Sequence, residues 1–421
     1  MISLRETHLS ARAYLACALA LLRDVCPRGD AAPPTASHLA LSPTWLAPRL
    51  AETGVSGADI AEIEIAGLAE NRGLVASMSK VLVTLRNGDK VHLVLKTSGT
   101  SLKSRREFIA YGRARETAFY NELARELPAG IQCPEVVYAH GSMWLGEYTI
   151  LMVDLTADGD AVGINLLLGN QAWGLPDGFT PRDDDERLDV LGKAWTSAAA
   201  LHGAFWMDES VMAKGFLKGV DWLQGSGRAS WENYQSISID GWASFLNKYD
   251  ATTAEFKMDA RFERLVSEGL RANTWENLQR RLKARPFTMC HGDFHASNMI
   301  MTNGKPVVFD WSEVGPSRPA GDAAQMAISD LPARLFPKIK DLLRKTYWEP
   351  LVAHERVGDS YSFEECWNDF CLDGLQRWIW VYGILADMQL PAHAMQYHQE
   401  QMLAFLALPG NDERKYFADV V

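Results

Sequence analysis

The 421-residue sequence lacks the features that define several protein classes. Its six cysteines are scattered, and no two form a Cys-x-x-Cys pair. The sequence therefore predicts neither a zinc ribbon nor a disulfide framework. This cysteine usage favours a reducing compartment, so we expect a cytoplasmic protein. A formal net charge of -11 argues against nucleic acid as a partner, because a nucleic-acid surface would be strongly basic.

Long hydrophobic runs are also missing. The only long apolar run near a terminus covers residues 13–22, which is too short to span a bilayer, and we expect no membrane partner. Arg5 and Arg12 precede this run, as in a signal peptide, but Arg23 and Asp24 follow it at once. An ordinary helix is the favoured interpretation, and a targeting segment stays open as the alternative.

Several common active-site loops are absent. The sequence has no Gly-x-Gly-x-x-Gly or Walker loop, and no Gly-x-Ser-x-Gly elbow of the kind that hydrolases carry. It contains no internal repeat and no low-complexity tract. With 47% hydrophobic residues, the chain can bury a large core, and its length favours two lobes over one.

The N-terminal part carries the signals of a β-sheet. Apolar residues alternate on both sides of Asn87-Gly88, a dipeptide typical of a type I′ hairpin turn. These alternating residues are Val81, Val83, Leu85, Val91, Leu93 and Leu95. Two more strands are expected within residues 131–154, which gives about five strands in all. Residues 104–127 predict one long helix between them.

Helical patterns dominate the rest of the chain. Residues 157–185 are rich in Gly, Asp and Pro and predict a loop or insertion, and residues 188–202 then predict an amphipathic helix. A second hairpin is expected around Asn303-Gly304. The sequence thus predicts a bilobal α+β fold with an antiparallel sheet plus helix in the N-lobe and a larger, mainly helical C-lobe. The expected parts are an extension at 1–41, a nucleotide-binding N-lobe at 42–153, and a catalytic C-lobe at 154–421.

The most informative segment reads His-Gly-Asp-Phe-His-Ala-Ser-Asn from His291 to Asn298, followed by Phe-Asp-Trp around Asp310. It brings two carboxylates and an amide to one hairpin, and Mg²⁺ prefers such oxygen ligands together with phosphate oxygens. We interpret Asn298 and Asp310 as metal ligands, and Asp293 as the base that accepts or orients the proton of a hydroxyl. Each residue alone could instead cap its own loop.

The two histidines of this segment allow another interpretation. His291 and His295 have a His-x-x-x-His spacing, which suits zinc on a helix but not in a loop. We therefore expect His291 to brace the loop by hydrogen bonding and His295 to contact phosphate or loop backbone.

A nucleotide site is expected in the N-lobe. Lys96 ends an apolar strand on the face opposite the leucines, and a partly buried lysine needs a carboxylate partner. Glu116 and Glu107 are the candidates, and the aromatic residues after Glu116 favour it. Gly73 and Ser77 lie in a segment that could cover phosphates through backbone N–H groups.

The segment that joins the two predicted lobes is a further candidate for nucleotide binding. Backbone groups near Val153 could bind adenine there, although the sequence has no side-chain signal for it.

These residues resemble those of a known family. The segment from His291 to Asn298, with Asp310, is similar to the catalytic and metal segments of aminoglycoside phosphotransferases and choline kinases, which have the protein-kinase-like fold. Further similarity points to the ecdysteroid-kinase-like (CHK kinase-like) branch. It is carried by Gly73–Ser77, Leu-Val-Leu-Lys96, Glu116–Tyr120, Trp45-Leu46 and Leu201–Trp206.

The resemblance implies a role for each matched residue. Lys96 would bind the α- and β-phosphates, and Glu116 would hold Lys96. Asp293 would be the catalytic base, and Asn298 would share the magnesium ion with the second carboxylate. Asp322 resembles an aspartate that braces the catalytic loop. No Ala-Pro-Glu motif follows, which argues against a protein substrate.

The acceptor is the least determined part. Three acidic residues recur every four positions at Glu365, Asp369 and Asp373, among aromatic residues that include Trp367, Phe370, Trp378, Trp380 and Tyr382. Acids with aromatics would suit a cationic amine. The family branch implies instead a hydroxyl on a bulky apolar molecule. The sequence therefore predicts an ATP- and Mg²⁺-dependent small-molecule kinase with an alcohol acceptor, and the alternative is a non-catalytic pseudokinase or nucleotide-binding module.

Overall fold

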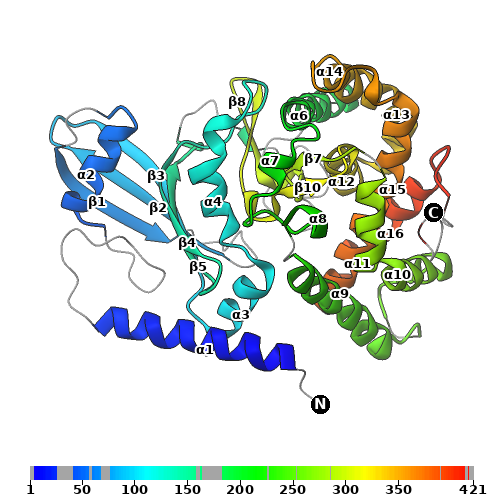
Figure 1. Cartoon of the computed structure of the whole chain (residues 1–421), viewed down its shortest axis with the longest axis horizontal. Helices are drawn as coiled ribbons and strands as arrows, with labels where there is room; N and C mark the ends of the chain where they lie inside the picture. Colours follow the sequence, from blue (N-terminus) through cyan, green and yellow to red (C-terminus); the bar gives the residue numbers. More distant parts are fainter. Residues whose placement is uncertain are drawn as a thin grey trace. The chain divides into compact units, whose positions relative to one another are not determined.

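The structure of the chain is a computed structural model (Figure 1). It describes residues 4–25, 41–55, 59–67, 76–157, 162–163, 183–224, 227–252, 254–284, 286–388, 390–412 and 416. The chain divides into two compact units. The first comprises Met1–Glu126 and Cys133–Gly159, and the second comprises Leu127–Gln132 and Asp160–Val421.

The first unit is built on an antiparallel sheet with strand order β1-β2-β3-β5-β4. Its elements are α1 (Leu4–Val25), α2 (Pro43–Glu52), β1 (Ile60–Gly67), β2 (Ala76–Leu85), β3 (Lys90–Ser98), α3 (Leu102–Tyr111), α4 (Arg115–Glu122), η1 (Ala124–Glu126), β4 (Val136–Ser142) and β5 (Glu147–Val153). The predicted five-stranded antiparallel sheet is therefore confirmed.

Helix α2 closes one side of the hydrophobic core of this unit. Its N-cap is Ser42, whose Oγ accepts a hydrogen bond from the Trp45 backbone N–H at 3.1 Å. Trp45, Leu46 and Leu50 are buried in one cluster with the apolar side chains of the sheet. The alternation of apolar residues in β2 and β3 thus faces this cluster, as the pattern predicts.

The two Asn-Gly dipeptides form different turns. At Asn303-Gly304 both residues have positive φ, 51° and 71°, and the flanking residues pair directly, which is a type I′ turn. At Asn87-Gly88 only Gly88 has positive φ, and its N–H donates to the Leu85 carbonyl at 2.9 Å. The predicted type I′ turn is wrong there, because a three-residue loop places the glycine at a bulge position.

The single long helix predicted for residues 104–127 is also wrong. The chain forms α3 and α4 with a break at Gly112, which adopts φ 60° and caps α3. Its N–H donates to the Ile109 carbonyl, and the next N–H donates to the Phe108 carbonyl. A glycine in the left-handed conformation ends a helix in this way at little steric cost.

The second unit is largely helical. Its elements are β6 (Val162–Gly163), α6 (Asp184–Ala204), α7 (Glu209–Met212), α8 (Asp221–Gln224), α9 (Arg228–Lys248), α10 (Ala260–Ala272), α11 (Trp275–Lys283), β7 (Thr288–Cys290), η2 (Ala296–Asn298), β8 (Met299–Thr302), β9 (Lys305–Val308), η3 (Trp311–Glu313), β10 (Gly315–Ser317), α12 (Ala320–Asp330), η4 (Ala333–Lys338), α13 (Ile339–Leu343), η5 (Arg344–Trp348), α14 (Glu349–Val352), η6 (Gly358–Ser360), α15 (Phe363–Asp387) and α16 (Ala392–Leu406).

Helix α15 lies at the centre of this unit, in contact with α9, α10, α12 and α16 (Figure 1). Helix α6 confirms the helix predicted for residues 188–202, although most of its residues in this range are buried, so that its polar face is narrow. Most of the predicted insertion at 157–185 lies outside the described residues, and within it β6 pairs with β8. Among the described helices, none combines the length and the apolar character that a membrane span requires.

Candidate active site

A short loop after β7 carries the candidate base. Strand β7 pairs with β10, and the chain then turns at Gly292, whose φ is 81°. A Cβ on Gly292 would collide with the Glu313 backbone carbonyl. Only glycine fits this position without strain, because the conformation is left-handed and the neighbouring atom is rigid backbone.

One buried carboxylate, that of Asp322 at the start of α12, holds the loop. The two oxygens of Asp322 accept hydrogen bonds from the backbone N–H groups of His291 at 2.7 Å and Gly292 at 3.0 Å. The Nε2 atom of His202 lies 3.3 Å from the same carboxylate. The carboxylate therefore holds two consecutive peptide groups of the loop in one orientation.

Four side chains surround the carboxylate of Asp293. Its Oδ1 accepts hydrogen bonds from Gln325 Nε2 at 2.9 Å and Arg377 Nη2 at 3.2 Å. Its Oδ2 accepts one from Asn298 Nδ2 at 3.3 Å and lies 3.5 Å from His295 Nε2. The candidate base is thus oriented by groups from its own loop, from α12 and from α15.

The charges around Asp293 favour its ionised form. Burial by itself would raise the pKa of Asp293, but the attraction of His295 and Arg377 outweighs it and holds the pKa well below its ordinary value. In the same way burial would lower the pKa of His295, and the attraction of Asp293 raises it instead. The carboxylate is therefore ionised at neutral pH.

The hairpin brings the two expected metal ligands together. The Phe309 N–H donates to the Asn298 carbonyl at 3.0 Å, so Asp310 follows directly beside Asn298. Asn298 uses its amide nitrogen on the Asp293 backbone carbonyl at 2.9 Å, which leaves its amide oxygen for another partner. Asp310 has φ 62°, a conformation that is strained for a residue other than glycine and clusters at functional sites. This pair of hard oxygen donors fits Mg²⁺.

The ring of His291 acts as a brace within the loop. It is buried, its Nδ1 accepts from the Asp293 N–H at 3.2 Å, and its Nε2 contacts the Phe309 carbonyl at 3.0 Å. Burial lowers the pKa of His291, which keeps the ring neutral, so that Nε2 is the donor in the second contact. The ring thereby joins the base segment to the segment before Asp310.

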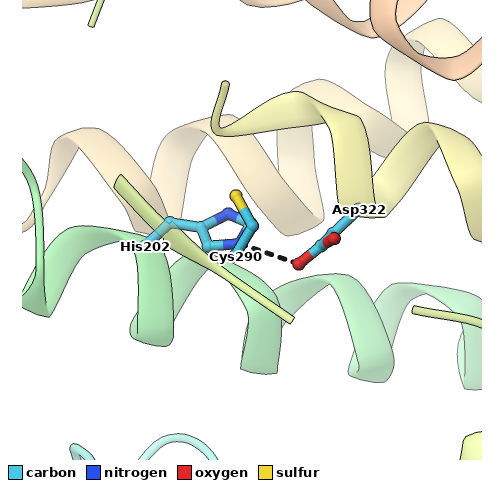
Figure 2. Close-up of side chains that lie close together, drawn as sticks. All are labelled: His202, Cys290 and Asp322. Atoms are coloured by element: carbon cyan, nitrogen blue, oxygen red, sulfur yellow. Dashed lines mark hydrogen bonds and ion pairs between the residues drawn. The ribbon is translucent and has the colours of Figure 1, made fainter. Parts of the chain in front are cut away.

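Figure 2 shows a second group of potential ligands, one of which, Asp322, binds the backbone of the loop. His202, Cys290 and Asp322 place one ligand atom each within 4.8 Å of one another. Burial raises the pKa of the Cys290 thiol well above its ordinary value, and its Sγ donates to the Arg318 carbonyl at 3.4 Å. The thiol and the carboxylate of this cluster are thus both hydrogen-bonded to backbone groups, and the cluster supports the loop.

The sequence did not reveal every group at this site. Gln325 lies three residues after Asp322, one helical turn along α12, so a helical reading of that segment could have indicated it. Arg377 lies 84 residues from Asp293, and no local pattern connects the two. Asp330, at the end of α12, accepts from the Ala296 N–H at 2.9 Å and was also missed.

The first unit contains the ion pair expected of Lys96. Its Nζ lies 2.7 Å from Glu116 Oε2, and both side chains are buried. Glu107, the other candidate, lies on α3 and pairs with Lys103 at 4.0 Å. A buried pair of this kind holds the ammonium group in one position.

The remaining nucleotide candidates are less defined. Gly73 lies outside the described residues. Ser77 is exposed on β2, paired in register with Thr97. The N–H groups of Val153 and Asp154 donate to the carbonyls of Glu135 and His92, at 2.9 Å each. The backbone carbonyl of Val153 is therefore the atom to consider for adenine.

The acidic face predicted on α15 is not an open carboxylate surface. Asp369 is buried and pairs with Arg318 at 2.7 Å, and Asp373 lies 3.6 Å from the same guanidinium. Glu365 forms a capping box with Ser362 at the start of the helix. The aromatic residues Trp367, Phe370, Trp378 and Tyr382 are core side chains.

Comparison with known proteins identifies the family. Residues 74–351, more than half of the chain, match the phosphotransferase enzyme family (APH). The chain belongs to this family. None of the curated proteins matches the sequence.

Solved structures of small-molecule kinases resemble the chain in fold. A choline kinase from Cryptosporidium parvum Iowa II is 11% identical with a TM-score of 0.49, covering 82% of this chain and 88% of its own. A choline/ethanolamine kinase family protein from Mesorhizobium loti is 13% identical with a TM-score of 0.44, covering 88% and 97%. An aminoglycoside phosphotransferase, in complex with GDP, is 12% identical with a TM-score of 0.42, covering 86% and 96%. At these identities the likeness concerns the fold alone.

Proposed function

We propose that the chain is an ATP- and Mg²⁺-dependent kinase that transfers the γ-phosphate to a hydroxyl group of a small molecule. One observation carries this proposal. An ionised Asp293, the amide of Asn298 and the carboxylate of Asp310 come from one hairpin whose loop is held by a buried carboxylate. This combination supplies a base and two oxygen ligands, which phosphoryl transfer from a magnesium nucleotide requires.

Each residue would contribute by position and charge. Asp293 would accept a hydrogen bond from the acceptor hydroxyl and orient its oxygen toward the phosphate. Asn298 and Asp310 would hold Mg²⁺, which neutralises phosphate charge when bound. The buried pair of Lys96 and Glu116 supports a role for this lysine at the nucleotide phosphates.

The resemblance to the ecdysteroid-kinase-like branch supports a bulky, largely apolar acceptor. A cationic acceptor has less support, because Arg318 already binds two of the three acidic groups on which that idea depends. The expected cytoplasmic location stays a prediction.

The test is consumption of ATP with a panel of alcohols, followed by ADP detection and mass spectrometry of the product. We expect an added phosphate, a requirement for Mg²⁺, and loss of turnover in Asp293→Ala. The rival function is a non-catalytic nucleotide-binding module. Nucleotide binding without ADP formation across the whole panel would favour that rival, and release of pyrophosphate would indicate nucleotidyl transfer.

A further inference from the structure

Arg377, which contacts the candidate base, belongs to a group of two basic side chains and two aromatic rings. Arg377 contacts Asp293, and its guanidinium carbon lies 4.7 Å from the centre of the Trp380 ring, one turn further along α15. Lys218 Nζ lies 5.7 Å from the same ring. Tyr234 of α9 packs against Trp380 with ring centres 5.3 Å apart. We call these four residues, Lys218, Tyr234, Arg377 and Trp380, the basic aromatic cluster.

The charge that reaches solvent in this cluster is positive. Lys218 pairs with Glu313 at 2.6 Å, and the second oxygen of Glu313 accepts from the Tyr234 hydroxyl at 2.6 Å. The side chain of Glu313 is 3% exposed, whereas that of Lys218 is 28% exposed. The carboxylate is thus covered by its own partners, and the ammonium group is the accessible member of the pair.

Arg377 has donors to spare. A guanidinium carries five N–H donors, and among the described residues Arg377 donates one hydrogen bond, from Nη2 to Asp293. Among the residues that the structure describes, its buried Nε has no hydrogen-bond partner. The Arg377 side chain is 19% exposed, so its remaining terminal donors can meet an oxyanion of a ligand.

We propose that the basic aromatic cluster binds an oxyanion of the phosphoacceptor, a carboxylate, sulfate or phosphate group, and that Arg377 determines this specificity. The acceptor would be an acidic alcohol whose hydroxyl reaches Asp293 and whose apolar body lies against Trp380. This inference rests on the proposed kinase function. It goes beyond that function because it gives the charge of the substrate, and it disfavours amines, because the donors of Lys218 and Arg377 cannot accept a hydrogen bond from an ammonium group.

The test uses sets of related acceptors, each with a neutral, an anionic and a cationic member. One set is benzyl alcohol, 4-(hydroxymethyl)benzoate and 4-(hydroxymethyl)benzylamine, and the other is glucose, glucuronate and glucosamine. In each set that is phosphorylated, we expect the anionic member to have the lowest KM. Arg377→Gln should raise that KM roughly tenfold or more and change the KM of the neutral member little. Arg377→Lys should restore part of the preference, because it keeps the charge but not the fork of donors.

Arg344→Gln is the matched control. Arg344 is an exposed arginine whose guanidinium lies 4.0 Å from the Phe363 ring, and it does not contact Asp293. The Arg344→Gln substitution should leave all KM values unchanged. A preference for neutral or cationic acceptors would overturn the proposal, as would an equal rise in KM for all acceptors in Arg377→Gln. In those cases the kinase function stands and Arg377 serves only to position Asp293.

If no acceptor of the panel is phosphorylated, a binding measurement tests the anion site. The full chain is titrated with 4-(hydroxymethyl)benzoate, and NMR monitors the titration. Binding to Arg377→Gln should be weaker than binding to the wild type. No binding, or equal binding to both, refutes the anion site. Failure of the kinase function itself appears separately, as the absence of ADP formation with every alcohol tested.

Discussion

Asp322→Asn is the substitution that most directly tests how the loop is held. The asparagine has nearly the same shape, but it offers one acceptor oxygen where the carboxylate offers two. One backbone N–H, of His291 or Gly292, then meets an NH₂ group in a buried position. Loss of one charge-assisted hydrogen bond and burial of one unsatisfied donor should together cost about 3 kcal/mol or more of unfolding free energy. That is a large share of a typical total of about 5–15 kcal/mol.

The pH dependence of this loss is a sharper measurement. Burial would raise the pKa of Asp322, but hydrogen bonds, first that of His202, lower it below the ordinary value of 3.8. The stabilisation by the carboxylate is therefore fully present above pH 3.8 and is lost as pH falls through the lower folded value. Denaturant unfolding of wild type and variant should give curves that converge at acid pH. A gap that stays constant from pH 7 to pH 3 would refute this reasoning.

Asp330→Asn is the matched control, because Asp330 accepts one loop N–H and has the opposite shift. Burial raises its pKa to about 6. The folded chain favours the neutral form of Asp330. The resulting gain in unfolding free energy is fully present below pH 3.8 and is lost as pH rises through about 6. Asparagine imitates the neutral acid. The variant should thus be as stable as wild type near pH 4 and up to about 3 kcal/mol more stable at pH 8. A marked loss of stability at pH 8 would contradict the assignment.

Five further substitutions test the site. Asp293→Ala and Asp310→Ala should each lower kcat by roughly 10²-fold or more; steady-state ADP assays check this, and near-normal turnover in either variant refutes its role. Lys96→Met should mainly weaken ATP binding, and Glu116→Gln should do so less; nucleotide titration measures both, and unchanged ATP affinity in Lys96→Met would count against the phosphate contact. Gly292→Ala should lower stability by about 1 kcal/mol or more and reduce turnover, because a Cβ meets rigid backbone in a left-handed turn; thermal unfolding checks this, and an unchanged Tm would contradict it.

The sheet and the helical region could be predicted because their signals are local. Alternating residues before and after Asn87 fix which side of a strand is apolar, and a three- and four-residue spacing does the same for α6. Local signals fail where one residue decides between two conformations. Gly112 ended a predicted helix, and Asn87-Gly88 formed a bulged loop, because backbone conformation at a glycine depends on its neighbours in space.

The sequence by itself determined the chemistry of the candidate site, since Asp293, Asn298 and Asp310 lie within one hairpin and chain connectivity alone brings them together. Only the tertiary structure decided what surrounds them. Arg377 reaches Asp293 from a helix 84 residues away, and Arg318 covers the acids of that same helix. Such contacts depend on how separate helices pack against one another, and a pattern that spans a few residues carries no record of that packing.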